Sequence, residues 1–243
     1  MTTIAVLIAR GGSKRLPGKN IMDFCGHPLI AWTIIHARAC KKIDEVYVST
    51  DSEEIAEISR NYGATVLMRE DPRESIDSAP GTVPMNIAFK RIAQMRSVDT
   101  VIHLFCTSPL RKPGDIDRLI QAYEETGKPH SFYTVIKDAF IYKKIDDHIC
   151  REVIRNKTGF YLYGVGGTGI SSIEPIPIVD WNDKATWQDP GPLNPNPFYY
   201  VLVDWWQEFE VDRQSDFDIC EFFFERYLLT KWEAIYERLS EGM

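Results

Sequence analysis

Apolar stretches of strand length alternate with segments of helical periodicity from the N-terminus to about residue 135. The short apolar stretches predict strands at residues 3–9, 45–49, 65–68, 100–105 and 131–135. Between them, apolar residues recur at helical spacing and predict helices near residues 28–40, 52–62, 83–96 and 113–126. Such alternation is typical of α/β proteins with a doubly wound, mostly parallel sheet, which is the fold that we expect here.

Local signals add to this pattern. Asp51 or Ser52 can cap the helix at 52–62, and Pro113 suits the first turn of the helix at 113–126. A further apolar face of helical spacing predicts a helix over residues 216–239.

The pattern breaks down between about residues 138 and 208. Residues 137–147 look like a short polar hairpin, and the rest of the segment is rich in aromatic side chains. Prolines exclude long regular elements there, at Pro175, Pro177, Pro190, Pro192, Pro195 and Pro197. A stretch of this kind is more often a binding lid or a partner-packing arm than an idle loop. We therefore expect one domain, residues 1–243, in which residues 138–208 are an irregular insertion for substrate binding or dimerisation.

The loop of residues 9–20 directly follows the first expected strand and carries the strongest chemical signal in the chain. It holds three glycines, a serine, an asparagine and the four cations Arg10, Lys14, Arg15 and Lys19. Glycines let backbone N–H groups approach phosphate oxygens, and the cations supply mobile positive charge around them. We expect the ligand to be a nucleoside triphosphate, although a solvated basic turn is the alternative.

Other phosphate loops do not fit this segment. Asn20 stands where a P-loop has its metal-binding hydroxyl, and the adjacent pair Gly11 and Gly12 does not match a dinucleotide fingerprint. Residues 164–169 formally satisfy G-x-G-x-x-G, but no helix can follow them. We interpret that segment as a flexible turn.

Composition limits the classes of function. The formal net charge of -7 argues against a general nucleic-acid binder. The cysteines are five in number and form no C-x-x-C pair, which indicates reduced thiols in a cytosolic protein. No apolar segment approaches transmembrane length, and the N-terminal apolar stretch is too short for a signal peptide. We therefore expect a cytoplasmic protein that binds neither nucleic acid nor membrane.

Four further blocks accompany the basic loop, at residues 48–57, 69–77, 107–111 and 209–217. Together with the loop they resemble the acylneuraminate cytidylyltransferase family, the CMP-sialic acid synthetases and their relatives. The blocks occur in the family's order and cover the first half of the chain and its last third, with a poorly matching stretch between them. The resemblance implies a Rossmann-like nucleotidyltransferase fold, a homodimer, and transfer of CMP from CTP to an acidic sugar with release of pyrophosphate.

The resemblance also implies roles for individual residues. Catalysis is implied for Arg10, Lys19 and Asp212, with Lys19 at the α-phosphate. Arg69 corresponds to an arginine linked to nucleotide recognition, and Arg73 could take its place. The implied nucleotide-binding residues are Ala9, Arg10, Gly11, Gly12, Ser13, Lys14, Lys19, Asn20, Arg69 and Asp77.

Glu210 and Asp212 are the expected metal ligands. On a strand, their spacing would place both carboxylates on one face, an arrangement that suits Mg²⁺. The family has an Asp-x-Asp pair at this position, and the first residue here is Glu. A solvated strand face is the alternative for this pair alone.

The acceptor substrate is expected to be atypical. The family has Gln-Pro where this chain has Phe105 and Cys106, and its sugar-binding strand has no counterpart between residues 150 and 208. Arg151 and Arg155 are candidates for binding a carboxylate or phosphonate. The expected substrate-binding residues are Phe105, Thr107, Ser108, Arg111 and Arg155, although Arg111 could instead brace its turn.

Two other functions remain open. A nucleotide-sugar-dependent glycosyltransferase shares the α/β nucleotide fold and an acid-x-acid metal site. A non-catalytic nucleotide-binding homologue is the second, because Phe105 and Glu210 depart from the family pattern.

Overall fold

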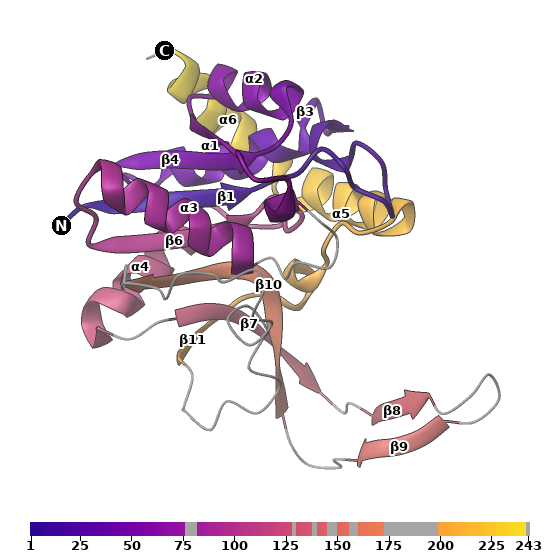
Figure 1. The fold of residues 1–243 in the computed structure, drawn as a ribbon. Coiled ribbons are helices and arrows are strands. Elements are labelled where there is room, and N and C mark those ends of the chain that lie inside the picture. Colours follow the sequence, from indigo (N-terminus) through magenta and orange to yellow (C-terminus); the bar gives the residue numbers. More distant parts are fainter. Residues whose placement is uncertain are drawn as a thin grey trace.

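The computed structural model describes residues 1–75, 82–127, 130–137, 140–144, 150–155, 160–172 and 199–241. Seven strands within these residues form one sheet in the order β11-β7-β10-β6-β1-β4-β5 (Figure 1). Strand β1 pairs in parallel with β4 and β6, and β10 runs antiparallel to β6 and β7. The strands are β1 (Thr3–Ile8), β4 (Glu45–Thr50), β5 (Thr65–Met68), β6 (Thr100–Phe105), β7 (His130–Lys137), β10 (Phe160–Ser172) and β11 (Tyr199–Leu202).

Helices cover both faces of this sheet because alternate residues of each strand point to opposite sides. Ala5 and Leu7 of β1 pack in one apolar cluster with α1, α2 and α4, whereas Ile4 and Val6 pack in another with α3. The three-layer arrangement is that of a doubly wound α/β fold, as expected. The helices are α1 (Leu29–Ala39), α2 (Glu53–Asn61), α3 (Thr82–Met95), α4 (Asp115–Thr126), α5 (Gln214–Tyr227) and α6 (Leu229–Ser240).

A third apolar cluster fastens α5 and α6 to the outer side of α1. Phe24, Trp32, Phe224 and Trp232 are fully or almost fully buried in it. The indole N–H of Trp32 donates to the Phe24 carbonyl at 2.6 Å, so the polar edge of that ring is satisfied inside the core. The C-terminal helices are thereby part of the same folded unit as the sheet.

The predicted strands and helices up to residue 135 are confirmed, with small shifts at their ends. Ser52 caps α2, since its side chain accepts the N–H of Ile55. Pro113 is not in the first turn of α4, because Gly114 in a left-handed conformation (φ 87°) precedes a helix that starts at Asp115. The predicted helix over 216–239 is two helices, α5 and α6, because Leu228 has a non-helical φ of -124°.

The interpretation of residues 138–208 as irregular is wrong for its middle part. Strand β10 is 13 residues long and lies inside the main sheet. Gly164 and Gly169, interpreted above as a flexible turn, lie within this strand and flank a register shift in its pairing with β7. Glycines suit such a bulge, which bends a strand without ending it. The proline-rich part of the segment lies outside the described residues.

The predicted hairpin is longer than expected. Strands β8 (Phe140–Lys144) and β9 (Cys150–Arg155) pair antiparallel in a two-stranded ribbon that lies away from the main sheet (Figure 1). A second small pair joins β2 (Asp23–Phe24) to β3 (His27–Pro28). Short 3₁₀ turns complete the described elements: η1 (Lys19–Ile21), η2 (Pro72–Ser75) and η4 (Trp205–Glu208). None of the helices in the described residues is both long and apolar enough to cross a bilayer.

Candidate functional site

Three loops meet at the carboxyl ends of β1, β4 and β6. The backbone N–H of Gly11 donates to Asp51 Oδ1 at 2.8 Å, which joins the loop after β1 to the end of β4. The thiol of Cys106 donates to Asn20 Oδ1 at 3.1 Å, which joins the same loop to the end of β6. Parallel sheets bind ligands at this edge, where the strand order reverses on either side of β1. The loops that follow β1 and β6 are therefore in contact at this edge of the sheet.

The basic loop is held in a defined shape by its own polar groups. Asn20 is 5% exposed, and its amide nitrogen donates to the Arg10 carbonyl at 3.0 Å. Gly18 has a φ of 68° and starts the η1 turn. A Cβ at Gly11 would lie 3.0 Å from Ser52 Cβ, so a larger residue there would have to displace the cap of α2 slightly. The cations are therefore presented from a folded segment.

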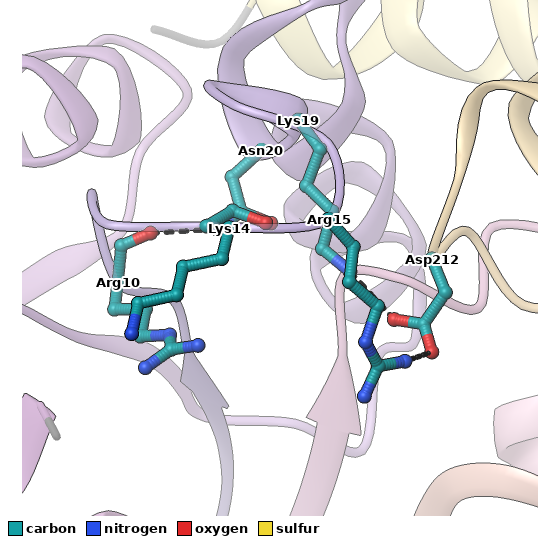
Figure 2. A pocket seen from close by; sticks show the side chains of 7 residues that line it. Arg10, Lys14, Arg15, Lys19, Asn20 and Asp212 are labelled. Carbon is teal, nitrogen blue, oxygen red and sulfur yellow. Dashed lines mark hydrogen bonds and ion pairs between the residues drawn. The ribbon is translucent and has the colours of Figure 1, made fainter. Parts of the chain in front are cut away.

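The loop and Asp212 line an open cavity of about 410 Å³ (Figure 2). Four of its lining residues are cations, so the cavity concentrates positive potential in a protein whose net charge is negative. Such a site attracts a polyanion. The lining residues are Arg10, Ser13, Lys14, Arg15, Lys19, Asn20 and Asp212.

Asp212 meets two of these cations. The Lys19 ammonium donates to Asp212 Oδ1 at 3.0 Å and to the Val211 carbonyl at 2.7 Å. The Arg15 guanidinium forms an ion pair with Asp212 Oδ2 on the opposite side of the carboxylate (Figure 2). The predicted catalytic residues Lys19 and Asp212 are thus in direct contact.

Glu210 and Asp212 do not lie on a strand, contrary to the prediction. Residues 209–212 form an irregular segment between η4 and α5. Val211 is fully buried, and its N–H donates to the Thr107 carbonyl at 2.7 Å. Asp216 Oδ2 accepts the N–H of Asp212 at 3.2 Å, and so fixes the other side of the segment. Because the core holds Val211, its two acidic neighbours stay half-buried at the site edge.

The two carboxylates form a donor set that fits a magnesium ion. Burial raises the pKa of the Glu210 carboxyl, the Ser108 hydroxyl opposes this by donating to it at 3.4 Å, and the charge of Asp212 raises the pKa further. The described residues contain no cluster of three or more His, Cys, Asp or Glu that could hold a metal ion by itself. Magnesium commonly binds through one or two carboxylates and takes its remaining ligands from water and phosphate.

Arg69 lies beside the loop. Its guanidinium donates to the Ser49 carbonyl at 3.2 Å and to the Ser75 hydroxyl at 3.0 Å, and burial lowers its pKa. Arg10 donates to the Ser75 carbonyl at 3.1 Å, so residues 69–75 border the cavity wall. The alternative residue, Arg73, forms an exposed ion pair with Asp71. Asp77 lies outside the described residues.

Arg111 is buried and is hydrogen bonded to the turn after β6. Its guanidinium donates to the Phe105 carbonyl at 3.0 Å and to the Thr33 hydroxyl at 3.4 Å, and burial lowers its pKa to about 10. These contacts fit the alternative interpretation, in which Arg111 braces its turn. Arg111 and Phe105 do not line the 410 Å³ cavity.

The other predicted substrate-binding residues lie in two separate parts of the structure. Thr107 and Ser108 lie next to the Glu210 segment, to which each is hydrogen bonded. Arg151 and Arg155 belong to β9, in the ribbon that lies away from the main sheet (Figure 1).

Sequence reasoning did not assign three residues that the structure brings to the site. Arg15 was counted among the loop cations but given no role, and Asp51 was considered as a helix cap and as one residue of a matching block. Asp216 was one residue of a matching block. The position of Asp51 directly after β4 is a usable signal, since parallel strands place such residues at the ligand edge.

Comparisons with known proteins show the family of this chain. A family model described as cytidylyltransferase matches residues 4–163. The match therefore reaches into the segment that was expected to match poorly, and it ends before Glu210 and Asp212.

Two curated relatives match the N-terminal part of the chain. A CMP-N,N'-diacetyllegionaminic acid synthase from Legionella pneumophila is 42% identical over 130 residues, which are 53% of this chain and 56% of that protein. A pseudaminic acid cytidylyltransferase from Campylobacter jejuni is 37% identical over 143 residues, 58% of this chain and 60% of that protein. The chain thus spans only 56% and 60% of the length of these relatives.

A solved structure shares the fold over almost the whole chain. It is a CMP:2-keto-3-deoxy-manno-octonic acid synthetase complexed with CTP, with a TM-score of 0.67 and 17% sequence identity. The superposition covers 94% of this chain and 100% of that chain. At this identity the likeness shows the Rossmann-like nucleotidyltransferase fold.

Proposed function

Because the chain belongs to the cytidylyltransferase family, we propose that it transfers CMP from CTP to an acidic sugar and releases pyrophosphate. The observation that carries the proposal is the cavity, which is lined by four cations and by Asp212. A nucleoside triphosphate has the charge to occupy it. The reaction would take place in the cytoplasm, because the sequence indicates that the cysteines are reduced thiols.

The loop residues supply the triphosphate site. Backbone N–H groups of residues 9–13 and the side chains of Arg10, Ser13, Lys14 and Lys19 would bind phosphate oxygens. Lys19 would neutralise the charge that develops on the α-phosphate, and its contacts with Val211 and Asp212 support this role because a fixed ammonium needs little reorganisation. Arg69 and Asp77 remain proposed contacts of the nucleotide. Asn20 also remains a proposed contact of the nucleotide, since it lines the cavity, and its amide is held by the Arg10 carbonyl and the Cys106 thiol.

Glu210 and Asp212 would hold the magnesium ion. When bound, the ion would lower the pKa of the attacking hydroxyl and offset the charge of the departing pyrophosphate. The contacts of Val211 with Thr107, of Ser108 with Glu210 and of Asp216 with Asp212 hold the segment that carries both carboxylates.

The acceptor would bind on the β6 side of the cavity, next to Thr107 and Ser108. The two curated relatives are named for legionaminic and pseudaminic acids, which places acid sugars of this class first among the candidates. Phe105 in place of the family's polar residue favours an acceptor that differs from theirs in its substituents. Arg111 would shape this wall through the Phe105 carbonyl, and Arg155 is proposed to contact the acceptor.

We expect the purified protein to release pyrophosphate from CTP with magnesium and at least one acceptor from a panel of acid sugars and phosphonates. UTP and ATP serve as nucleotide controls, and CTP binding is measured in parallel by calorimetry. Binding of CTP without turnover of any acceptor would favour a non-catalytic homologue. Hydrolysis of a nucleotide sugar without CTP turnover would favour a glycosyltransferase. Neither CTP binding nor turnover would refute the proposal.

We also propose a homodimer formed through an aromatic surface on α5 and η4. Phe209 and Phe223 stack at 5.5 Å, and Trp206 and Tyr227 stack at 5.3 Å, among exposed apolar side chains. Exposed apolar side chains that gather in this way are typical of interaction sites. The exposed apolar residues of this surface are Trp205, Ile219, Phe222 and Tyr227.

Gel filtration with light scattering is expected to give twice the chain mass of 28.0 kDa. Phe222→Asp should shift the mass to that of a monomer, because a charge in an apolar interface is costly to bury. Met95→Asp is the control, since Met95 is an exposed apolar residue on α3, outside this surface. A wild-type protein that elutes only as a monomer would contradict the dimer.

A further inference from the structure

Both oxygens of the Asp212 carboxylate are engaged by cations of the basic loop. Lys19 Nζ lies 3.0 Å from Oδ1, and Arg15 forms an ion pair with Oδ2. The proposed function assigns Lys19 to the triphosphate and Asp212 to the metal, and gives Arg15 no role. The loop neutralises a carboxylate that the proposed reaction needs for a divalent cation.

The two cations differ in how firmly they are held. The Lys19 side chain is 12% exposed and also bonds the Val211 carbonyl, so it is part of the folded segment. The Arg15 side chain is 66% exposed, and its partner Asp212 is 49% exposed. Ion pairs this exposed contribute little to stability, because water and salt screen them. Arg15 can thus change partners at small cost.

We propose that Arg15 exchanges the Asp212 carboxylate for a phosphate oxygen when the nucleotide binds, and thereby frees Asp212 for the divalent cation. This inference rests on the proposed function. A guanidinium binds carboxylate and phosphate with the same planar pair of N–H donors, so both partners suit it. Both lie within reach, because Arg15 and Asp212 line the same cavity (Figure 2).

The exchange couples two binding events. A triphosphate that removes Arg15 from Asp212 improves metal binding, and by thermodynamic reciprocity the metal improves triphosphate binding by the same factor. Metal alone must compete with Arg15. Arg15 is accordingly a positioning residue for the metal and a binding residue for the nucleotide.

Arg15→Gln tests the exchange, because its two expected effects have opposite signs. With Mn²⁺ alone as the probe, free Mn²⁺ measured by electron paramagnetic resonance should show tighter binding to the variant, by about twofold to fivefold, the range of an exposed ion pair. With CTP in EDTA, calorimetry should show weaker binding to the variant, by roughly tenfold, as expected for a lost charge-assisted hydrogen bond.

Arg60→Gln is the matched control, since Arg60 forms an exposed ion pair with Glu53 at 2.8 Å on α2. It should leave both affinities unchanged. Equal or weaker Mn²⁺ binding to Arg15→Gln, or unchanged CTP binding, would overturn the exchange while the proposed function stands. A wild-type protein that binds neither CTP nor Mn²⁺ would overturn both.

Discussion

Replacing Lys19 with methionine is expected to lower kcat for pyrophosphate release from CTP by about 10²–10³-fold, the usual cost of removing one fixed donor to a developing oxyanion. Lys19 is the least exposed cation of the Asp212 contact, and the Val211 carbonyl orients it at 2.7 Å. A charge held in this way stabilises the transition state without first having to reorganise. Because Met keeps the length of the side chain, the variant removes charge and hydrogen bonds with little change in volume.

Steady-state kinetics with saturating CTP and acceptor measure this effect. Lys42→Met is the control, because Lys42 forms an exposed ion pair with Glu124 at 2.6 Å and does not line the cavity. Its kcat should stay within twofold of wild type. If Lys19→Met also stays within that range, another group neutralises the α-phosphate. Thermal unfolding of Lys19→Met separates a loss of chemistry from a loss of fold.

Replacing Phe224 with alanine is expected to lower the free energy of unfolding by about 3–5 kcal/mol. Phe224 is fully buried on α5, with ring contacts to Trp32 at 4.6 Å and Phe24 at 5.3 Å. The deletion leaves a cavity between α5 and α1 that rigid neighbouring rings cannot fill. A loss of this size is a large fraction of the 5–15 kcal/mol that stabilises a typical domain.

Urea denaturation followed by tryptophan fluorescence measures the change. Met95→Ala is the control, since Met95 is an apolar residue of α3 that is 59% exposed and lies outside the proposed dimer surface. Its effect should be under about 0.5 kcal/mol. Similar losses for both variants would contradict the packing of α5 described here. Helix α5 begins at Gln214, two residues after Asp212 of the cavity. Loosening α5 should therefore also weaken nucleotide binding.

The parallel part of the fold could be predicted because its strands are buried on both faces. In β1 the apolar run is continuous and ends in the basic loop, so the strand and the ligand edge follow from the same few residues. Strand β10 carries the opposite signal. Its glycines, including Gly164 and Gly169, read as a turn in sequence, and only pairing with β7 on one side and β6 on the other makes them a strand.

The candidate site, like the fold, could be predicted only in part from the sequence. The cations of the loop could be recognised from composition alone. The partnership of Lys19 with Asp212 could not be derived from periodicity, because 193 residues separate them and the segment around Asp212 has no regular structure. The strand predicted there was wrong for a physical reason. Val211 alternates with polar neighbours as a strand residue would, but tertiary bonds to Thr107 and Asp216 hold the segment instead of a sheet.

The contact between Lys19 and Asp212 also has a consequence for the synthesis and folding of the chain. The ribosome makes the basic loop 193 residues before its carboxylate partner, so a nascent chain holds Lys19 without Asp212 for most of its synthesis. Contacts between residues this distant in sequence also slow folding, because a long loop must close before they form. The cavity is therefore complete only after residues 209–216 have docked against the N-terminal half of the chain.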